Sequence, residues 1–79
     1  MNNKFAKILE LENGGQVLLV KEKTKEDKVF VVIRTDVNDI GMSSRIQFVD
    51  DDKASAYMND FTMSNAARFY SDATKFAVG

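Results

Sequence analysis

The sequence of 79 residues contains no cysteine, histidine, proline or tryptophan. Without cysteine, the chain can form no disulfide and offers no thiolate to a metal. Small secreted domains usually depend on such cross-links, so the composition favours a soluble protein of the reducing cytoplasm. Without histidine, the chain also lacks the commonest general base and the commonest transition-metal ligand. We therefore expect a cytoplasmic protein that is not an enzyme and uses no cofactor.

Long apolar runs are also missing from the sequence. The longest, Val29 to Ile33, suits a buried strand and falls far short of the roughly 20 residues that a membrane span needs. Lys4 and Lys7 interrupt the segment where a signal peptide would be apolar. The sequence therefore predicts a single domain over residues 1–79, with no membrane segment.

Charge is nearly balanced, at a net −1, so no overall field attracts nucleic acid. Its distribution along the chain is uneven. Residues 1–34 carry seven Lys/Arg against five Asp/Glu, and residues 35–79 carry four against seven. This pattern predicts a surface with one weakly basic end and one acidic end.

Four segments have the alternation or β-branched composition of strands, and they cover Phe5–Leu11, Val17–Lys23, Val29–Thr35 and Arg45–Val49. The first two are joined by Asn13-Gly14-Gly15, residues that tolerate the positive φ of a tight hairpin turn. The third segment places Val29, Val31 and Ile33 on one face and Phe30, Val32 and Arg34 on the other, as expected of a central strand. Between the third and fourth, Asp36 to Ser44 has the composition of a long loop.

The end of the sequence changes to helical periodicity. Two apolar stripes appear, formed by Ala54, Tyr57, Met58 and Phe61 and then by Ala66, Phe69, Tyr70, Ala73 and Phe76. Ser64 is the predicted N-cap of the second helix, with a break at Thr62 to Ser64; one kinked helix is the alternative. The order predicts an α+β fold, a four-stranded antiparallel β-meander followed by two short C-terminal helices packed on one face. Phe61, Phe69 and Phe76 are expected to pack on Val17, Leu19, Val31, Ile33 and Phe48.

Two acidic segments raise the question of a metal site. Asp50-Asp51-Asp52 directly precedes a helical stripe, which favours helix capping over binding of a divalent cation. The segment from Asp36 to Gly41 has some features of a calcium loop, but Ile40 stands where an oxygen ligand is required and Gln47 where a bidentate Glu is required. No metal site is predicted.

One hairpin gathers basic residues, namely Lys21, Lys23, Lys25, Lys28 and Arg34. Such a patch could contact phosphate. Acidic residues are interleaved with it, however, at Glu22, Glu26 and Asp27, and lysines near a sheet edge also discourage aggregation. A solvated surface is the favoured interpretation.

The overall layout resembles that of small bacteriophage accessory proteins, some of which are anti-CRISPR or other host-takeover inhibitors. The resemblance lies in the strand order, the Asn13-Gly14-Gly15 hairpin and the helical end from Asp50 to Phe76, and no family residue can be carried over. It implies stoichiometric inhibition of a protein in the host cytoplasm.

The leading hypothesis is thus a protein-interaction module with two candidate surfaces. One is the exposed sheet face and edge, with Lys21, Lys23, Arg34, Arg45 and Gln47. The other is an acidic end that could engage a basic groove, with Asp36, Asp39, Asp50, Asp51 and Asp52. The alternative is a small nucleic-acid-binding module that uses the hairpin from Lys21 to Arg34.

The sheet face opposite the helices is predicted to be too apolar to stay in water, since it carries Leu18, Val20, Phe30 and Val32. The sequence therefore predicts a two-fold homodimer through this face or through a strand edge. The alternative is that the face is reserved for the partner.

Overall fold

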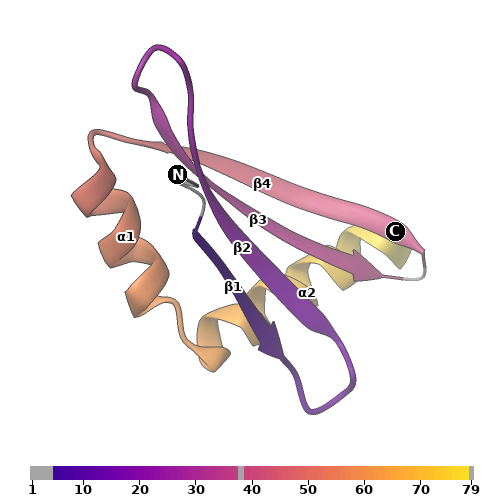
Figure 1. The fold of residues 1–79 in the computed structure, drawn as a ribbon. Coiled ribbons are helices and arrows are strands. Elements are labelled where there is room, and N and C mark those ends of the chain that lie inside the picture. Colours follow the sequence, from indigo (N-terminus) through magenta and orange to yellow (C-terminus); the bar gives the residue numbers. More distant parts are fainter. Residues whose placement is uncertain (1–4, 38, 79) are drawn as a thin grey trace.

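The computed structural model describes residues 5–37 and 39–78. Strands β1 (Phe5–Glu10), β2 (Gln16–Lys23), β3 (Val29–Val37) and β4 (Ile40–Phe48) are followed by helices α1 (Asp51–Asp60) and α2 (Met63–Val78). The strands form one antiparallel sheet in the order β1-β2-β3-β4, and both helices cover the same face (Figure 1). The predicted α+β fold is confirmed. Among the described residues, no helix is long and apolar enough to span a membrane.

The turn between β1 and β2 depends on two glycines for different reasons. Gly14 has a φ of +90° and donates its N–H to the carbonyl of Leu11 at 3.0 Å, so the predicted tight hairpin is confirmed. Gly15 instead provides space, because a Cβ there would lie 2.6 Å from a ring carbon of Tyr70. The second glycine therefore lets α2 approach the hairpin.

The predicted loop over Asp36 to Ser44 is wrong. β3 continues to Val37, which pairs with Ile40, and only residues 38 and 39 separate the two strands. Asp39 adopts a φ of +66°, as a tight turn between strands requires. The serines and glycine of this segment lie in β4, an edge strand whose exposed positions accept polar residues that would be costly in a central strand.

The core lies between the sheet and the helices. Val29, Val31 and Ile33 are buried on the inner face of β3, as the alternation predicts, together with Val17 and Leu19 of β2. The helices add buried side chains that follow the predicted stripes, namely Ala54 and Met58 of α1, Ala66 and Ala73 of α2, and Phe61 between them. This burial is the main stabilising contribution to the fold.

The break between the helices is confirmed, but its cap is not Ser64. α2 begins at Met63, and Thr62 precedes it. The Asn65 N–H donates to Thr62 Oγ1 at 3.4 Å, and the Thr62 N–H donates to Asn65 Oδ1 at 2.9 Å. This reciprocal pair is a capping box with asparagine in the position usually held by Glu or Gln. Ser64 therefore lies inside the first turn.

The predicted burial of Phe76 is also wrong. Its side chain is 79% exposed, although Phe69, two turns earlier, packs against the core as predicted. Phe76 lies beside Met42 and Ser44 of β4. Because β4 is the last strand of the sheet, no further strand lies beyond it to cover the ring.

Candidate protein-interaction surface

The sheet face turned away from the helices, here called the outer face, carries a cluster of apolar side chains. Ile8 of β1 pairs with Leu18 of β2, and Val20 of β2 pairs with Val32 of β3. Phe30 lies two residues from Val32 on the same face. Ile8 is 64% exposed and the other four are half-buried, with no helix over them. The outer face is therefore an apolar surface in contact with water.

Charged and polar groups frame this cluster. Arg45 lies opposite Val32 in the β3–β4 register, and its guanidinium carbon is 3.8 Å from the centroid of the Phe30 ring. That stacking orients the guanidinium and covers part of the ring. Gln47 lies opposite Phe30. The Nε of Arg34 is 4.0 Å from Oδ1 of Asp36, and an exposed ion pair of this length contributes little to stability.

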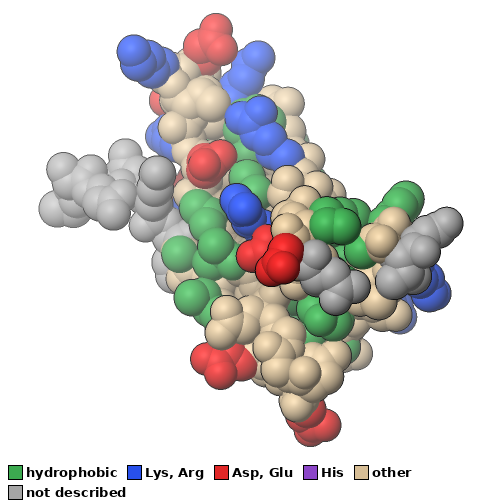
Figure 2. All heavy atoms as spheres, turned by 90° about the vertical axis from the view of Figure 1, so that its right-hand side faces the viewer, with side chains coloured by type: hydrophobic (Ala, Val, Ile, Leu, Met, Phe, Trp, Pro, Cys, Tyr) green, Lys and Arg blue, Asp and Glu red, His purple; other side chains and the backbone are tan. Residues whose placement is uncertain are grey.

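Figure 2 shows the molecule from the side that bears the β3–β4 turn, where hydrophobic side chains gather into patches with basic and acidic groups between them. An apolar centre with a polar rim is the usual arrangement of a protein–protein interface. Arginine and aromatic residues are also the types that most often contribute strongly to binding. The outer face has both, in the contact of Arg45 with Phe30.

The basic surface predicted from the sequence is divided between two faces. Lys21 and Lys23 lie on the helix side of β2, whereas Arg34, Arg45 and Gln47 lie on the outer face. The physical reason is strand alternation: the register pairs Lys21 with Val31, an inward position, and Lys23 with Val29. The five residues therefore form no single surface.

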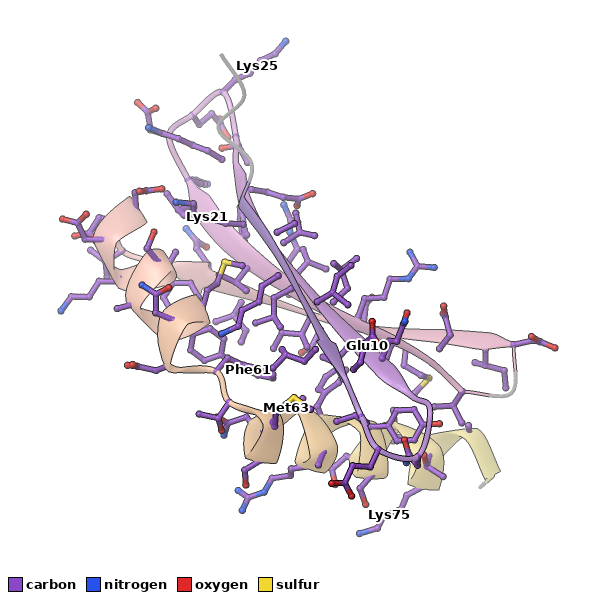
Figure 3. The ribbon with its side chains drawn as sticks, turned by 60° about the horizontal axis from the view of Figure 1, so that its bottom comes forward. Glu10, Lys21, Lys25, Phe61, Met63 and Lys75 are labelled. Atoms are coloured by element: carbon purple, nitrogen blue, oxygen red, sulfur yellow. The ribbon has the colours of Figure 1, made fainter. Side chains whose placement is uncertain are left out.

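Lys21 has a structural role instead. Its ammonium contacts Asp51 Oδ1 and the hydroxyl of Ser55, each at 2.9 Å, and its side chain is only 12% exposed (Figure 3). It thus ties the first turns of α1 to the sheet. Lys23 lies 3.7 Å from Asp27 in an exposed pair near the tip of the β2–β3 hairpin.

Lys7 holds the other end of α1 and was not singled out by the sequence. Its ammonium donates to the carbonyl oxygens of Met58 and Phe61, each at 2.9 Å. Both carbonyls belong to the C-terminal end of the helix, where a positive charge is favourable. We call Lys7 and Lys21 the lysine clamp. The alternation of β1 could have revealed it, because Lys7 shares the inward side with Leu9 while Ile8 faces outward.

The predicted acidic surface is also divided. Asp36 lies at the end of β3 and Asp39 in the β3–β4 turn, whereas Asp50 to Asp52 follow the other end of β4. That strand has nine residues, so the two groups lie about 27 Å apart. Their separation follows from the extension of β4 through the region predicted as a loop.

Asp50 is the N-cap of α1, as the capping interpretation predicts. Its Oδ1 accepts the N–H of Lys53 at 2.9 Å. Asp51 and Asp52 lie in the first turn of the helix, and Asp51 pairs with Lys21. No group of three or more acidic side chains within residues 5–37 and 39–78 is arranged to hold a metal ion.

The phenol of Tyr57 is partly removed from water by the packing around it. Burial raises the pKa of its phenol above the usual 10. The ring lies between Phe48 and Phe61, with centroids 5.2 and 5.9 Å away. Tyr57 therefore belongs to the aromatic edge of the core.

An open groove of about 730 Å³ lies between the β1–β2 turn and α2. Its lining includes Leu11, Met63, Tyr70 and Lys75, two of which are labelled along α2 in Figure 3. Glu12 and Lys75 are the charged residues of the lining, and the groove is open to solvent, with the character of a surface depression.

Comparison of the chain with known protein families, with curated proteins and with solved structures finds no match to any of them. A function must therefore be argued from the surfaces of the molecule itself.

Proposed function

We propose that this chain is a small protein-interaction module that binds a protein partner through its outer face. The observation that supports it most directly is the apolar cluster of Ile8, Leu18, Val20, Phe30 and Val32, left uncovered opposite two helices. Monomeric proteins seldom leave a contiguous apolar surface in water without a use for it. Such a module acts stoichiometrically, by occupying a surface of its partner.

We further propose that the partner is a host protein or nucleoprotein machine, which this binding inhibits. The resemblance of the chain's layout to that of bacteriophage accessory proteins supports this proposal. Arg34 and Arg45 at the rim favour a partner surface with acidic groups around an apolar centre.

Direct nucleic-acid binding through the hairpin from Lys21 to Arg34 is less well supported. Lys21 is largely buried in its pair with Asp51, and Arg34 faces the opposite side of the sheet from Lys21 and Lys23. Binding to phosphates would weaken steeply with salt, whereas binding through an apolar centre would not.

The test is affinity capture from a cell extract with the wild-type chain and two variants. Val32→Glu places a charge at the centre of the outer face, and Ala67→Glu places the same charge on an exposed position of α2. We expect one set of proteins to be retained by the wild type and by Ala67→Glu, and lost with Val32→Glu. Retention should survive about 0.5 M salt and nuclease treatment, since screening affects mainly exposed charges.

Both variants should keep the wild-type circular dichroism spectrum, because both positions are partly or fully exposed. Equal capture by all three chains would contradict binding through the outer face. Capture abolished by nuclease would instead favour the nucleic-acid alternative. Loss with Ala67→Glu alone would move the site to the groove beside α2.

A further inference from the structure

β4 is an open sheet edge without the usual protection. It has nine residues, of which only Arg45 is charged, and lies at one end of the strand order. Edge strands are normally short, or carry lysine, proline or bulges that prevent pairing with another chain. The other edge, β1, follows that rule: it has six residues and carries Lys7 and Glu10. Among the described strands, β4 is thus the one suited to pair with a further strand.

The sequence of β4 is complementary to itself about Ser44. If two copies pair antiparallel with Ser44 opposite Ser44, Ile40 faces Phe48 and Met42 faces Ile46, all on the helix side. On the outer side, Gly41 faces Gln47 and Ser43 faces Arg45. Apolar residues therefore meet apolar residues, and no like charges lie opposite each other, as favourable cross-strand pairing requires.

The neighbouring two-fold registers are worse. A shift that centres the pairing on Arg45 places two guanidinium groups directly opposite, which is destabilising. A shift that centres it on Ser43 leaves Phe48 without a strand residue opposite and puts Met42 against Ser44. Only the register about Ser44 uses all nine residues of the strand.

On the helix side of β4, a groove lies beside the strand. An open groove of about 230 Å³ runs beside Met42, Ser43 and Ser44, between β4 and the C-terminal half of α2. Phe69 and Phe76 line it, and Phe76 is 79% exposed. This groove adjoins Ser44, the residue at the centre of the self-complementary register. Side chains of a second copy's β4 that project to the helix side would be placed to cover Phe76.

From the strand complementarity and the uncovered Phe76, we propose that two copies of this chain pair through β4, antiparallel about a two-fold axis at Ser44. The pairing joins the two sheets into one continuous sheet. It also places the two outer faces side by side, so that the dimer presents two copies of the surface proposed for the partner. The dimer does not depend on that proposed function, because it uses the edge and not the outer face.

Disulfide cross-linking tests the register, since the chain contains no cysteine of its own. Two Ser44 residues on the axis form a non-hydrogen-bonded pair with Cα atoms about 4.5 Å apart, within the range for a disulfide. Oxidation of Ser44→Cys with diamide should therefore convert most of the chain to a covalent dimer. Ser43→Cys is the matched control on the same edge, because its two copies lie about 9 Å apart and cross-link poorly.

Sedimentation of the unmodified chain supplies the second measurement. At micromolar concentration we expect a mass near twice 8.9 kDa. Ser44→Glu and Ser44→Lys should each be monomeric, because like charges meet on the axis, whereas an equal mixture of the two should restore the dimer. Ser44 is exposed, so neither change should unfold the protomer.

Three outcomes would overturn the proposal. The first is a monomeric wild type up to about 100 μM, on the scale where weak specific association is still detected. The second is a dimer that cross-links equally at positions 43 and 44 and whose formation is unaffected by charges at position 44. The third is a dimer abolished by Val32→Glu, which would show association through the outer face instead.

Discussion

The lysine clamp leads to a sharp prediction about stability. Replacing Lys7 with methionine keeps the length and apolar stem of the side chain but removes the ammonium. The carbonyl oxygens of Met58 and Phe61 then lose donors that lie at 2.9 Å. A single hydrogen bond to a charged group contributes about 1.5–3 kcal/mol, and a cation at a helix C-terminus about 0.3–1 kcal/mol.

These contributions do not add fully. Lys7 is half-buried, and water can reach part of the freed carbonyls. We therefore expect Lys7→Met to lower the free energy of unfolding by about 2 kcal/mol, which for a domain of this size lowers Tm by about 10 °C. Thermal unfolding followed by circular dichroism, with urea unfolding as a second measure, gives both quantities.

Lys25→Met is the matched control, because Lys25 is an exposed lysine in the turn between β2 and β3. Its stability should stay within about 0.5 kcal/mol of the wild type, as for most surface changes. If Lys7→Met were no more destabilising than Lys25→Met, the two carbonyl contacts would not stabilise the docking of α1. That result would refute the reasoning on the clamp.

Three further predictions follow from single positions. Gly14→Val should destabilise the fold by about 1–2 kcal/mol in urea unfolding, because φ at this position is +90°, while an unchanged midpoint would contradict the tight turn. Asp50→Ala should cost about 1 kcal/mol through the lost cap, and calorimetry should show no binding of Mg²⁺ or Ca²⁺ that this change removes. Because burial raises the pKa of Tyr57 above that of the unfolded chain, the folded state retains the phenol proton longer, so stability should fall as pH rises past about 10. Tyr57→Phe should lose that part of the pH dependence; an identical decline above pH 10 in both proteins would exclude this cause.

The fold was predictable where each residue follows a local rule. The β1–β2 turn follows from the conformational freedom of Gly14, the inward face of β3 from strict alternation, and the start of α1 from the capping preference of Asp50. These features depend on residues close in sequence. The order of strands and helices then leaves few ways to bury one face of the sheet.

The errors arose where tertiary position overrides composition. Ser43 and Ser44 are typical of loops, yet the edge strand β4 accepts them because their side chains there are exposed to water. Phe76 continues a helical stripe but has no strand above it. Lys21 belongs to a basic segment in sequence, and only the strand register shows that it points under α1. Surfaces assembled from distant residues, such as both predicted binding surfaces, therefore required the structure.

The strictly sequential strand order has a consequence for folding of the chain. All four strands precede both helices, and each strand pairs with its immediate neighbour, so the sheet can form before α1 and α2 dock on it. In that interval, Leu19 and Val31 on one face and Val20 and Val32 on the other are exposed together. The sheet is then apolar on both sides and open along β4, the state of the chain most prone to aggregate. Docking of α1 and α2 ends this exposure, so a change that weakens the docking of α1, such as Lys7→Met, should also lower the yield of folded protein.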